Sequence, residues 1–187
     1  RANAADPTSS VDQDSLRVEG GTANIVYTNS IIENMLGRSV RVLNAAGLVD
    51  MRTVTVNSGF ATVAGAADEG VIVQGSSANV LFGPLLLRQG TLDLLNISGD
   101  ITFAGPVQLD AAAANLENPT GIPLHIDNSS GQITFNPGAT VLINTRPTRA
   151  VDLRHISGGI RFHDDVTINP AQGFGVFEPA LVWQENS

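Results

Sequence analysis

One phrase of twelve residues occurs three times in the second half of this chain. It reads NISGDITFAGPV at 96–107, NSSGQITFNPGA at 128–139 and HISGGIRFHDDV at 155–166. Each copy contains an aromatic residue that serves as an anchor, with an apolar residue two positions before it. Such a repeat constrains the chain more than any other feature, because repeated units that stack on one another determine the whole fold.

The same spacing of apolar residues relative to an anchor, called the frame here, extends upstream and covers six copies. The anchors are Tyr27, Met51, Phe82, Phe103, Phe135 and Phe162. The residues 11, 9 and 2 positions before every anchor are also apolar, without exception. The spacing between anchors varies from 21 to 32 residues, so insertions fall outside the frame. Apolar residues at alternate positions indicate two short strands per copy, each turning every second side chain inward.

A turn with its own repeated residues separates these two strands. Asn44, Asn96 and Asn128 stand at one offset, His155 takes that place in the last copy, and a Ser-Gly pair follows in the last three copies. Asn and Gly tolerate a left-handed backbone, and short polar side chains satisfy turn amides. We therefore expect His155 to form a hydrogen bond in the turn rather than to act in catalysis.

A third, looser apolar pair follows the later anchors. It comprises Leu86, Val107 with Leu109, Val141 with Ile143, and Val166 with Ile168. Three strands per copy predict an all-β fold, a parallel β-helix of about six turns and roughly 29 Å in length, with equivalent residues stacked about 4.8 Å apart. Short irregular or helical segments are expected in the loops and at the ends. A β-sandwich is the alternative, but it does not explain a frame without gaps.

The repeat also resembles a known family over residues 14–168. The segments that carry the resemblance are GRSVRVLNAAGLVDM, EGVIVQGSSANVLF, NISGDITF, IPLHIDNSSGQITF and AVDLRHISGGIRF. They are similar to the right-handed β-helix repeats, adhesin-like or pectin-lyase-like in fold, of very large secreted or surface-attached bacterial proteins. The resemblance implies a right-handed coil and a location outside the cell or on its surface. It does not imply an activity, because adhesins, filament proteins and polysaccharide-degrading enzymes all use such coils.

The two ends of the chain differ from the repeat and predict three parts. Residues 1–15 are polar and turn-rich and are expected to be a linker or a covering segment, and residues 16–173 are the repeat domain. Residues 174–187 are apolar and are expected to cap the solenoid or to begin a further turn. Because the chain starts at Arg1 without an initiator Met, we expect it to be a processed segment of something longer.

Charge and composition exclude several classes of function. The formal net charge is −8, and every basic residue is an Arg. An acidic chain without a basic stripe is poorly suited to bind nucleic acid or an acidic membrane surface. No apolar run approaches the ~20 residues that a transmembrane helix needs. The chain has no Cys, so disulfides and thiolate metal sites are excluded, and no cofactor is expected apart from a calcium ion on the acidic face described next.

The frame also aligns side chains that point outward. Ten residues before the anchor, Asp93, His125 and Asp152 should lie on three consecutive turns, with Asp127 and Arg154 beside them. Carboxylates beside a His could bind calcium or hold an acid–base pair. The alternative is that opposite charges stack favourably on a solvated sheet.

A second pair of carboxylates, Asp164 and Asp165, follows the last anchor. Adjacent Asp residues resemble those of pectin-degrading β-helix hydrolases, where paired carboxylates activate water and protonate the leaving oxygen. The N-x-D, G-H-G and R-x-K motifs on which that family also relies do not occur in this chain. A solvated turn is the better interpretation of this pair.

These observations favour an extracellular structural or adhesive protein that is not an enzyme. Ends without caps would pair with a second copy or with neighbouring repeats, and a head-to-tail contact of this kind builds filaments. The expected contacts are Val176, Phe177, Leu181 and Trp183 in the apolar tail. Two alternatives stay open: a polysaccharide lyase or hydrolase that uses the acidic face, and a module that binds a surface glycan through loops such as 110–121.

Overall fold

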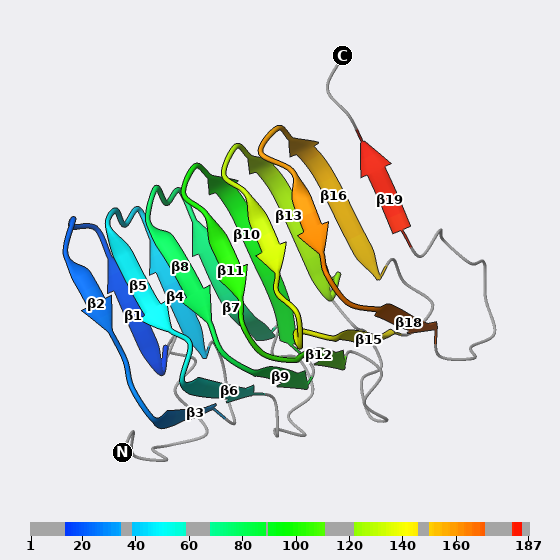
Figure 1. The fold of residues 1–187 in the computed structure, drawn as a ribbon, viewed down its shortest axis with the longest axis horizontal. Coiled ribbons are helices and arrows are strands. Elements are labelled where there is room, and N and C mark those ends of the chain that lie inside the picture. The colour runs from blue at the N-terminus through cyan, green and yellow to red at the C-terminus, as the bar shows by residue number, and fades with distance from the viewer. Residues whose placement is uncertain are drawn as a thin grey trace.

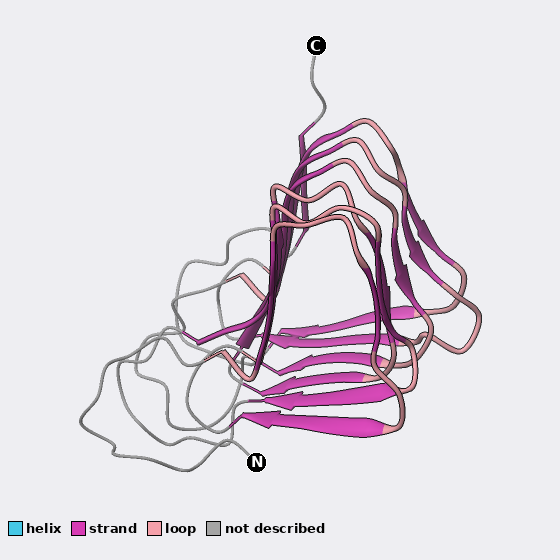
Figure 2. Ribbon diagram, turned by 90° about the vertical axis from the view of Figure 1, so that its left-hand side faces the viewer, coloured by secondary structure: helices cyan, strands magenta, loops and turns pink. Residues whose placement is uncertain are grey.

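The computed structural model describes residues 14–34, 39–58, 68–88, 90–110, 122–145, 150–170 and 181–184. All pairings between its strands are parallel, and they build three sheets that run along a common axis (Figure 1). Viewed from the N-terminal end, the chain turns clockwise as it recedes, so the coil is right-handed (Figure 2). The predicted fold class, a right-handed parallel β-helix of about six turns, is confirmed.

Each turn of the coil, called a rung here, contributes one strand to each sheet in the order A, B, C. Sheet A contains β1 (Leu16–Glu19), β4 (Val40–Leu43), β7 (Asp68–Gln74), β10 (Gly90–Ile97), β13 (Leu124–Ser129), β16 (Val151–Ile156) and β19 (Leu181–Gln184). Sheet B contains β2 (Asn24–Val26), β5 (Leu48–Met51), β8 (Asn79–Phe82), β11 (Ile101–Phe103), β14 (Ile133–Phe135) and β17 (Ile160–Phe162). Sheet C contains β3 (Ser30–Asn34), β6 (Val54–Ser58), β9 (Leu85–Arg88), β12 (Val107–Asp110), β15 (Val141–Thr145) and β18 (Val166–Pro170).

The core consists of ladders of equivalent side chains, as the frame predicts. The ring of Phe103 stacks on Phe82 and Phe135 with centroid distances of 5.2 and 4.4 Å. Phe162 continues the stack at 4.5 Å from Phe135. Ile101, two residues before its anchor, pairs with the corresponding Ile of the next rung. The repeated phrase exists because each copy must place its apolar side chains directly on those of the previous copy.

The turn between sheets A and B has the predicted left-handed residue. Asn44, Asn96, Asn128 and His155 all have φ between 49° and 54°. The amide of Asn128 donates to the side-chain oxygen of Asn96 at 2.7 Å, so the turns are joined by side chains as well as by backbone. The offset therefore selects residues that tolerate positive φ and can bond to the neighbouring rung.

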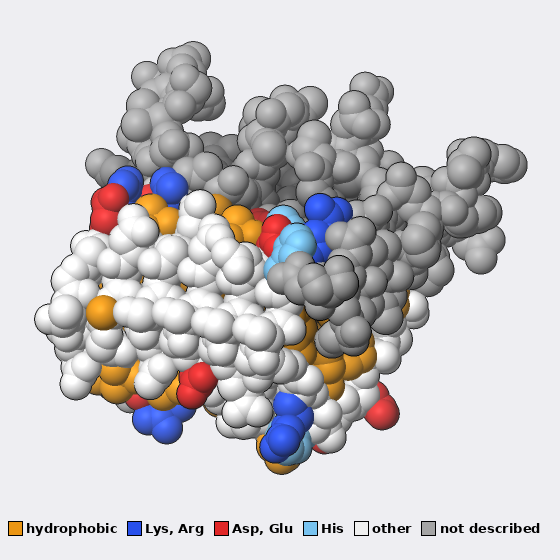
Figure 3. All heavy atoms as spheres, turned by 90° about the horizontal axis from the view of Figure 1, so that it is seen from above, with side chains coloured by type: hydrophobic (Ala, Val, Ile, Leu, Met, Phe, Trp, Pro, Cys, Tyr) orange, Lys and Arg blue, Asp and Glu red, His pale blue; other side chains and the backbone are white. Residues whose placement is uncertain are grey.

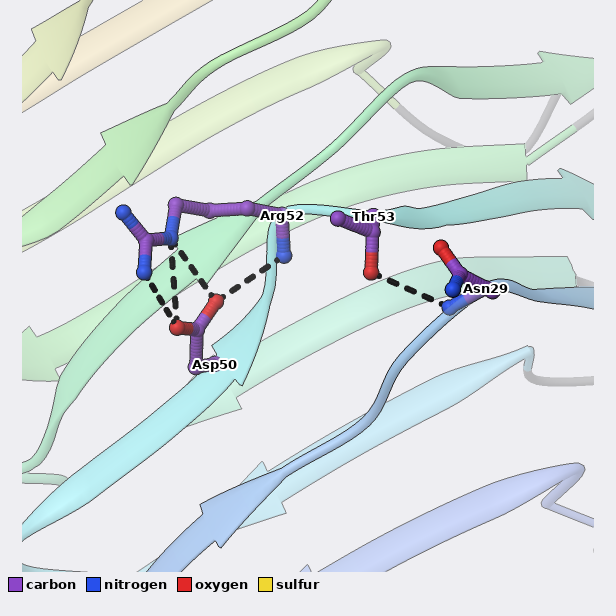
Figure 4. Close-up of polar contacts among 4 residues, drawn as sticks. All are labelled: Asn29, Asp50, Arg52 and Thr53. Carbon is purple, nitrogen blue, oxygen red and sulfur yellow. Dashed lines mark hydrogen bonds and ion pairs between the residues drawn. The ribbon is translucent and has the colours of Figure 1, made fainter.

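The turn between sheets B and C is held by side chains in the first rungs (Figure 4). The guanidinium of Arg52 donates to both carboxylate oxygens of Asp50, with Nη2 at 2.7 Å from Oδ2. These hydrogen bonds hold the pKa of Asp50 below its usual value. Nearby, the backbone N–H of Asn29 donates to the hydroxyl of Thr53 at 3.1 Å. Adjacent rungs are thus tied together at this corner too.

The prediction for sheet C is wrong at one residue. Leu85 and Leu87 of β9 are buried, whereas Leu86 lies opposite Gln108 on the outer face. A run of three Leu residues satisfies either phase of the alternating pattern. The pairing of β9 with β12 decides the phase. It places Leu85 and Leu87, the first and last residues of the run, on the buried residues Val107 and Leu109.

The longest insertions lie at one corner of the coil. Each connection from sheet A to sheet B has three or four residues, whereas those from sheet C to the next strand of sheet A range from one to thirteen. The Ala-rich run of the 110–121 loop, where a short helix is possible from sequence, lies outside the described residues from 111 onward. The described residues contain no helix. Most of the predicted linker at 1–15 also lies outside them.

Candidate functional site

The outer face of sheet A brings the predicted polar residues together. In the strand register, Asp93 pairs with His125 and His125 with Asp152. Asp127 of β13 pairs with Arg154 of β16. The predicted alignment on three consecutive rungs is therefore confirmed.

Asp152 and Arg154 form a two-point ion pair. The Arg154 Nε and Nη2 atoms donate to the two carboxylate oxygens of Asp152 at 2.9 and 2.7 Å. Asp152 is completely buried, and the hydrogen bonds raise the pKa of Arg154. Parallel charge-assisted hydrogen bonds of this kind fix geometry as well as supply energy, so this carboxylate is held as a structural group.

His125 lies between the carboxylates of the neighbouring rungs. Its Nδ1 atom is 3.3 Å from an oxygen of Asp93, whose other oxygen accepts a hydrogen bond from the hydroxyl of Thr91. The hydrogen bond to Asp93 raises the pKa of His125, burial opposes this effect, and the charges of Asp93, Asp152 and Asp127 reinforce it. A histidine in this setting gains a proton more readily than in water.

Asp127 lies on the same face and pairs with the turn. Its carboxylate lies 2.8 Å from Nδ1 of His155, the residue that replaces Asn in the left-handed position. The expectation that His155 forms a hydrogen bond is confirmed. Its partner was not predicted, although Asp127 stands one residue before Asn128 and is therefore placed beside the turn of the next rung.

One residue of the second carboxylate pair, Asp164, also contacts the neighbouring rung. Asp164 accepts a hydrogen bond from the backbone N–H of Gly138, in the loop of the preceding rung. The interpretation of this segment as a turn fits that contact. Within the described ranges, no group of three or more His, Cys, Asp or Glu side chains is arranged to hold a metal ion. The calcium site stays a prediction, and the face that would hold it has carboxylates already bonded to protein partners.

A second charged group lies at the N-terminal end of sheet A. Arg17 forms an ion pair with Glu19 at 2.7 Å, and both Arg17 and Arg41 lie within 4 Å of Asp14. In the view from above, these charges are separate from a group further along the rod that includes histidine (Figure 3). Both Arg residues stand ten residues before their anchors, at the same offset as Asp152. Glu19 was missed, although it stands at the same offset as Arg154.

The ends of the solenoid carry the remaining predicted contacts. Leu181 and Trp183 belong to β19, which pairs in parallel with β16 of the same chain. Val176 and Phe177 lie outside the described residues. The tail therefore contributes the first strand of a seventh rung, which is one of the two predicted arrangements.

The core ladders are incompletely covered at both ends. The partly buried apolar residues of the core belong to the first and last full rungs; they are Leu16, Ile25, Tyr27, Ile32, Ile156, Ile160, Phe162 and Ile168. On the last rung, Val166, which follows Val141 in its ladder, is 39% exposed. Edge strands of this kind present unpaired backbone groups next to apolar side chains, which is the usual template for pairing with another chain.

Comparison of this chain with known protein families, with curated proteins and with solved structures finds no match. In the part of the chain that the structure describes, there is no helix long and apolar enough to cross a membrane.

Proposed function

We propose that this protein is a structural rod that assembles end to end with other copies of itself. The observation that carries the proposal is the state of the two ends: apolar residues of the core ladders are half-buried there, whereas their equivalents in the middle rungs are fully buried. Burial of apolar area stabilises an interface by about 25 cal/mol per Å². A contact between unlike ends does not close on itself, so it builds filaments.

The polar face of sheet A supports a structural rather than a catalytic role. Asp152 is bonded to Arg154, Asp93 to Thr91 and His125, and Asp127 to His155. A hydrolase or lyase needs a carboxylate or base that is available to its substrate. Ion pairs between adjacent strands instead stabilise the stacking of rungs.

A location outside the cell, as part of a surface or adhesive structure, belongs to the same proposal. It is supported by the resemblance of the repeat to those of large secreted and surface-attached bacterial proteins. Antibody labelling of intact source cells tests it, and labelling that requires permeabilised cells would contradict it.

Assembly is tested directly with the full chain. Sedimentation velocity and electron microscopy across a concentration series should show species that grow with concentration and appear as unbranched rods of constant width. A single species of monomer mass at every concentration would contradict the proposal.

Recognition of a glycan by the face of sheet A is the second candidate. The observation in its favour is that the side chains of Asp93, His125 and Asp127 stay 16%, 27% and 33% exposed on adjacent strands. A glycan array with the full chain, and with Asp127→Asn as the matched variant, tests this function. If Asp127→Asn binds the glycan as the wild type does, the binding site does not include Asp127.

A further inference from the structure

The C-terminal end of the rod is uneven. Among the described residues, sheet A has one strand more than sheets B and C, because β19 continues beyond β16 while β17 and β18 are the last strands of their sheets. Val151 and Leu153 of β16 are buried under this extra strand. Ile160, Phe162 and Ile168 in the other two sheets are only partly buried. Within the residues that the structure describes, a further strand therefore covers the edge of sheet A but not the edges of sheets B and C.

The strands of the first rung match the strands at the C-terminal end of the rod in length. β1, β2 and β3 have four, three and five residues, and the terminal strands β19, β17 and β18 have the same lengths in their respective sheets. The register of β19 on β16 gives Leu181 the frame offset of Leu16. β19 thus occupies the place that a first strand would take on β16.

We propose that a second copy of this chain docks its first rung on this end, and that its β1 replaces β19 on β16. This inference rests on the end-to-end assembly proposed above and names the contact and its competitor. If β2 of the second copy pairs with β17 and β3 pairs with β18, its β1 must lie beside β16. A parallel edge accepts one neighbour, so β19 and the incoming β1 exclude each other.

Charge complementarity favours the second copy over β19 at this position. In the register of sheet A, Arg17 of the second copy would lie on Asp152, and its Glu19 would lie on Arg154. Both contacts join opposite charges on directly opposed residues, which stabilises a strand pair. β19 offers Val182 and Gln184 at the same two places, and neither carries a charge.

The other two sheets would continue the core ladders without a break. Tyr27 of the second copy would extend the aromatic stack beyond Phe162, and its Ile25 would lie on Ile160. In sheet C, its Ile32 would lie on Val166, and its Asn34 would take the place opposite Ile168. The ladders of Val151 and Leu153 in sheet A, of Ile160 and Phe162 in sheet B and of Val166 in sheet C would then have an apolar residue on both sides of the joint.

Weakening β19 in the full chain tests the competition. The substitutions Leu181→Asp and Trp183→Asp place charges at the two offsets that are apolar in every rung, and Leu181→Val with Trp183→Phe is the matched control. We expect the aspartate variant to assemble at a concentration at least tenfold lower than the wild type and the control, as followed by sedimentation velocity and electron microscopy. An unchanged threshold would overturn the competition. Loss of assembly in this variant alone would make β19 itself the contact, which overturns the inference but leaves the proposed function standing.

Reversing the charges of β1 tests the contact itself. Arg17→Glu with Glu19→Arg keeps an ion pair within β1 but places like charges on Asp152 and Arg154 of the next copy. We expect at least a tenfold higher assembly threshold than for the neutral control Arg17→Gln with Glu19→Gln, with unchanged far-ultraviolet circular dichroism in both. Equal thresholds for the two variants would overturn the proposed register. If no variant and no wild-type sample assembles at any concentration, the inference and the proposed function fail together.

Discussion

The replacement of Gly131 by Ala is the sharpest test of how closely the rungs stack. Gly131 lies in the turn between sheets A and B, and its N–H faces the carbonyl of Ile97 in the preceding rung, as does that of Ser130 at 2.8 Å. A methyl group on Gly131 would lie 1.9 Å from the carbonyl oxygen of Gly99. Because backbone atoms cannot yield as a flexible side chain does, the two turns must move apart by roughly 1 Å.

The cost follows from that separation. Overpacking of this kind costs about 1–3 kcal/mol, and weakening one backbone hydrogen bond adds about 1 kcal/mol. We therefore expect Gly131→Ala to lower the free energy of unfolding by about 3 kcal/mol. Gly138→Ala is the matched control, because its added methyl group meets nothing within 4 Å. Its φ of 89° still carries a conformational cost of about 1 kcal/mol.

Urea unfolding followed by circular dichroism measures both variants, since stability falls linearly with denaturant. The two substitutions add the same methyl group, so a loss of stability at Gly131 beyond the conformational cost at Gly138 reports the closeness of the neighbouring rung. If Gly131→Ala destabilises the protein no more than Gly138→Ala, the close stacking of the turns is refuted.

Three further predictions concern the core and the ion pairs. Phe103→Ala removes the middle of the aromatic stack and should cost about 3–5 kcal/mol in urea unfolding, and more than Phe162→Ala at the half-buried end; equal losses would contradict the ladder. The pKa of His125 is raised by its hydrogen bond to Asp93, so its contribution to stability is complete below its unfolded pKa of about 6.5 and is lost as pH rises through the folded value. Thermal unfolding from pH 5 to 9 should show this loss in the wild type but not in His125→Asn, and identical profiles would contradict it. The pKa of Asp50 is lowered by hydrogen bonds from Arg52, so its contribution is present above about 3.8 and is lost as pH falls through the folded value. Arg52→Gln should move acid unfolding to higher pH, and an unchanged acid midpoint would contradict the pairing.

Much of the fold could be predicted because a solenoid repeats the same pattern of inward apolar residues and turn residues in every rung. Apolar residues at four fixed offsets indicated which residues would stack, and the observed pairing of Ile101 with Ile133 follows that frame. The left-handed turn could be predicted from Asn96 and Asn128, because few residues other than Asn and Gly adopt that backbone readily.

The remaining features depend on information that one repeat does not contain. The phase of β9 was ambiguous because Leu86 is flanked by two further Leu residues, and only the register with β12 decides between them. The bond between Asp127 and His155 joins residues of two rungs at different offsets, so a comparison row by row does not reveal it. The pairing of β19 depends on how the chain returns after β18, where the frame places no constraint.

The charges on sheet A have a further consequence, because they distinguish the native register from its nearest competitor. Leu124 and Ile126 of β13 and Val151 and Leu153 of β16 are inward aliphatic residues, so the alternation of side chains alone does not distinguish the native register from a slip of two residues. On the outer face, the native register places Asp152 on His125 and Arg154 on Asp127. A slip in one direction would place Asp152 on Asp127, and a slip in the other would place Arg154 on His125. The first slip opposes two carboxylates, and the second moves Arg154 from Asp127 onto His125, whose pKa is raised by its hydrogen bond to Asp93.

The same reasoning applies to the proposed joint between copies. A slip of two residues there would place Arg17 of the second copy on Arg154, or its Glu19 on Asp152, whereas the apolar ladders alone would accept either shift. Ion pairs on a sheet surface contribute little to stability, about 0–1 kcal/mol each. Opposed like charges on adjacent strands are nonetheless enough to choose between registers whose cores are nearly equivalent. We therefore infer that charge pairing sets the alignment of β16 on β13 and of the second copy on β16, while the buried ladders provide the stability. The pairing of β1 with β4 differs, because Arg17 lies opposite Arg41 and both lie close to Asp14.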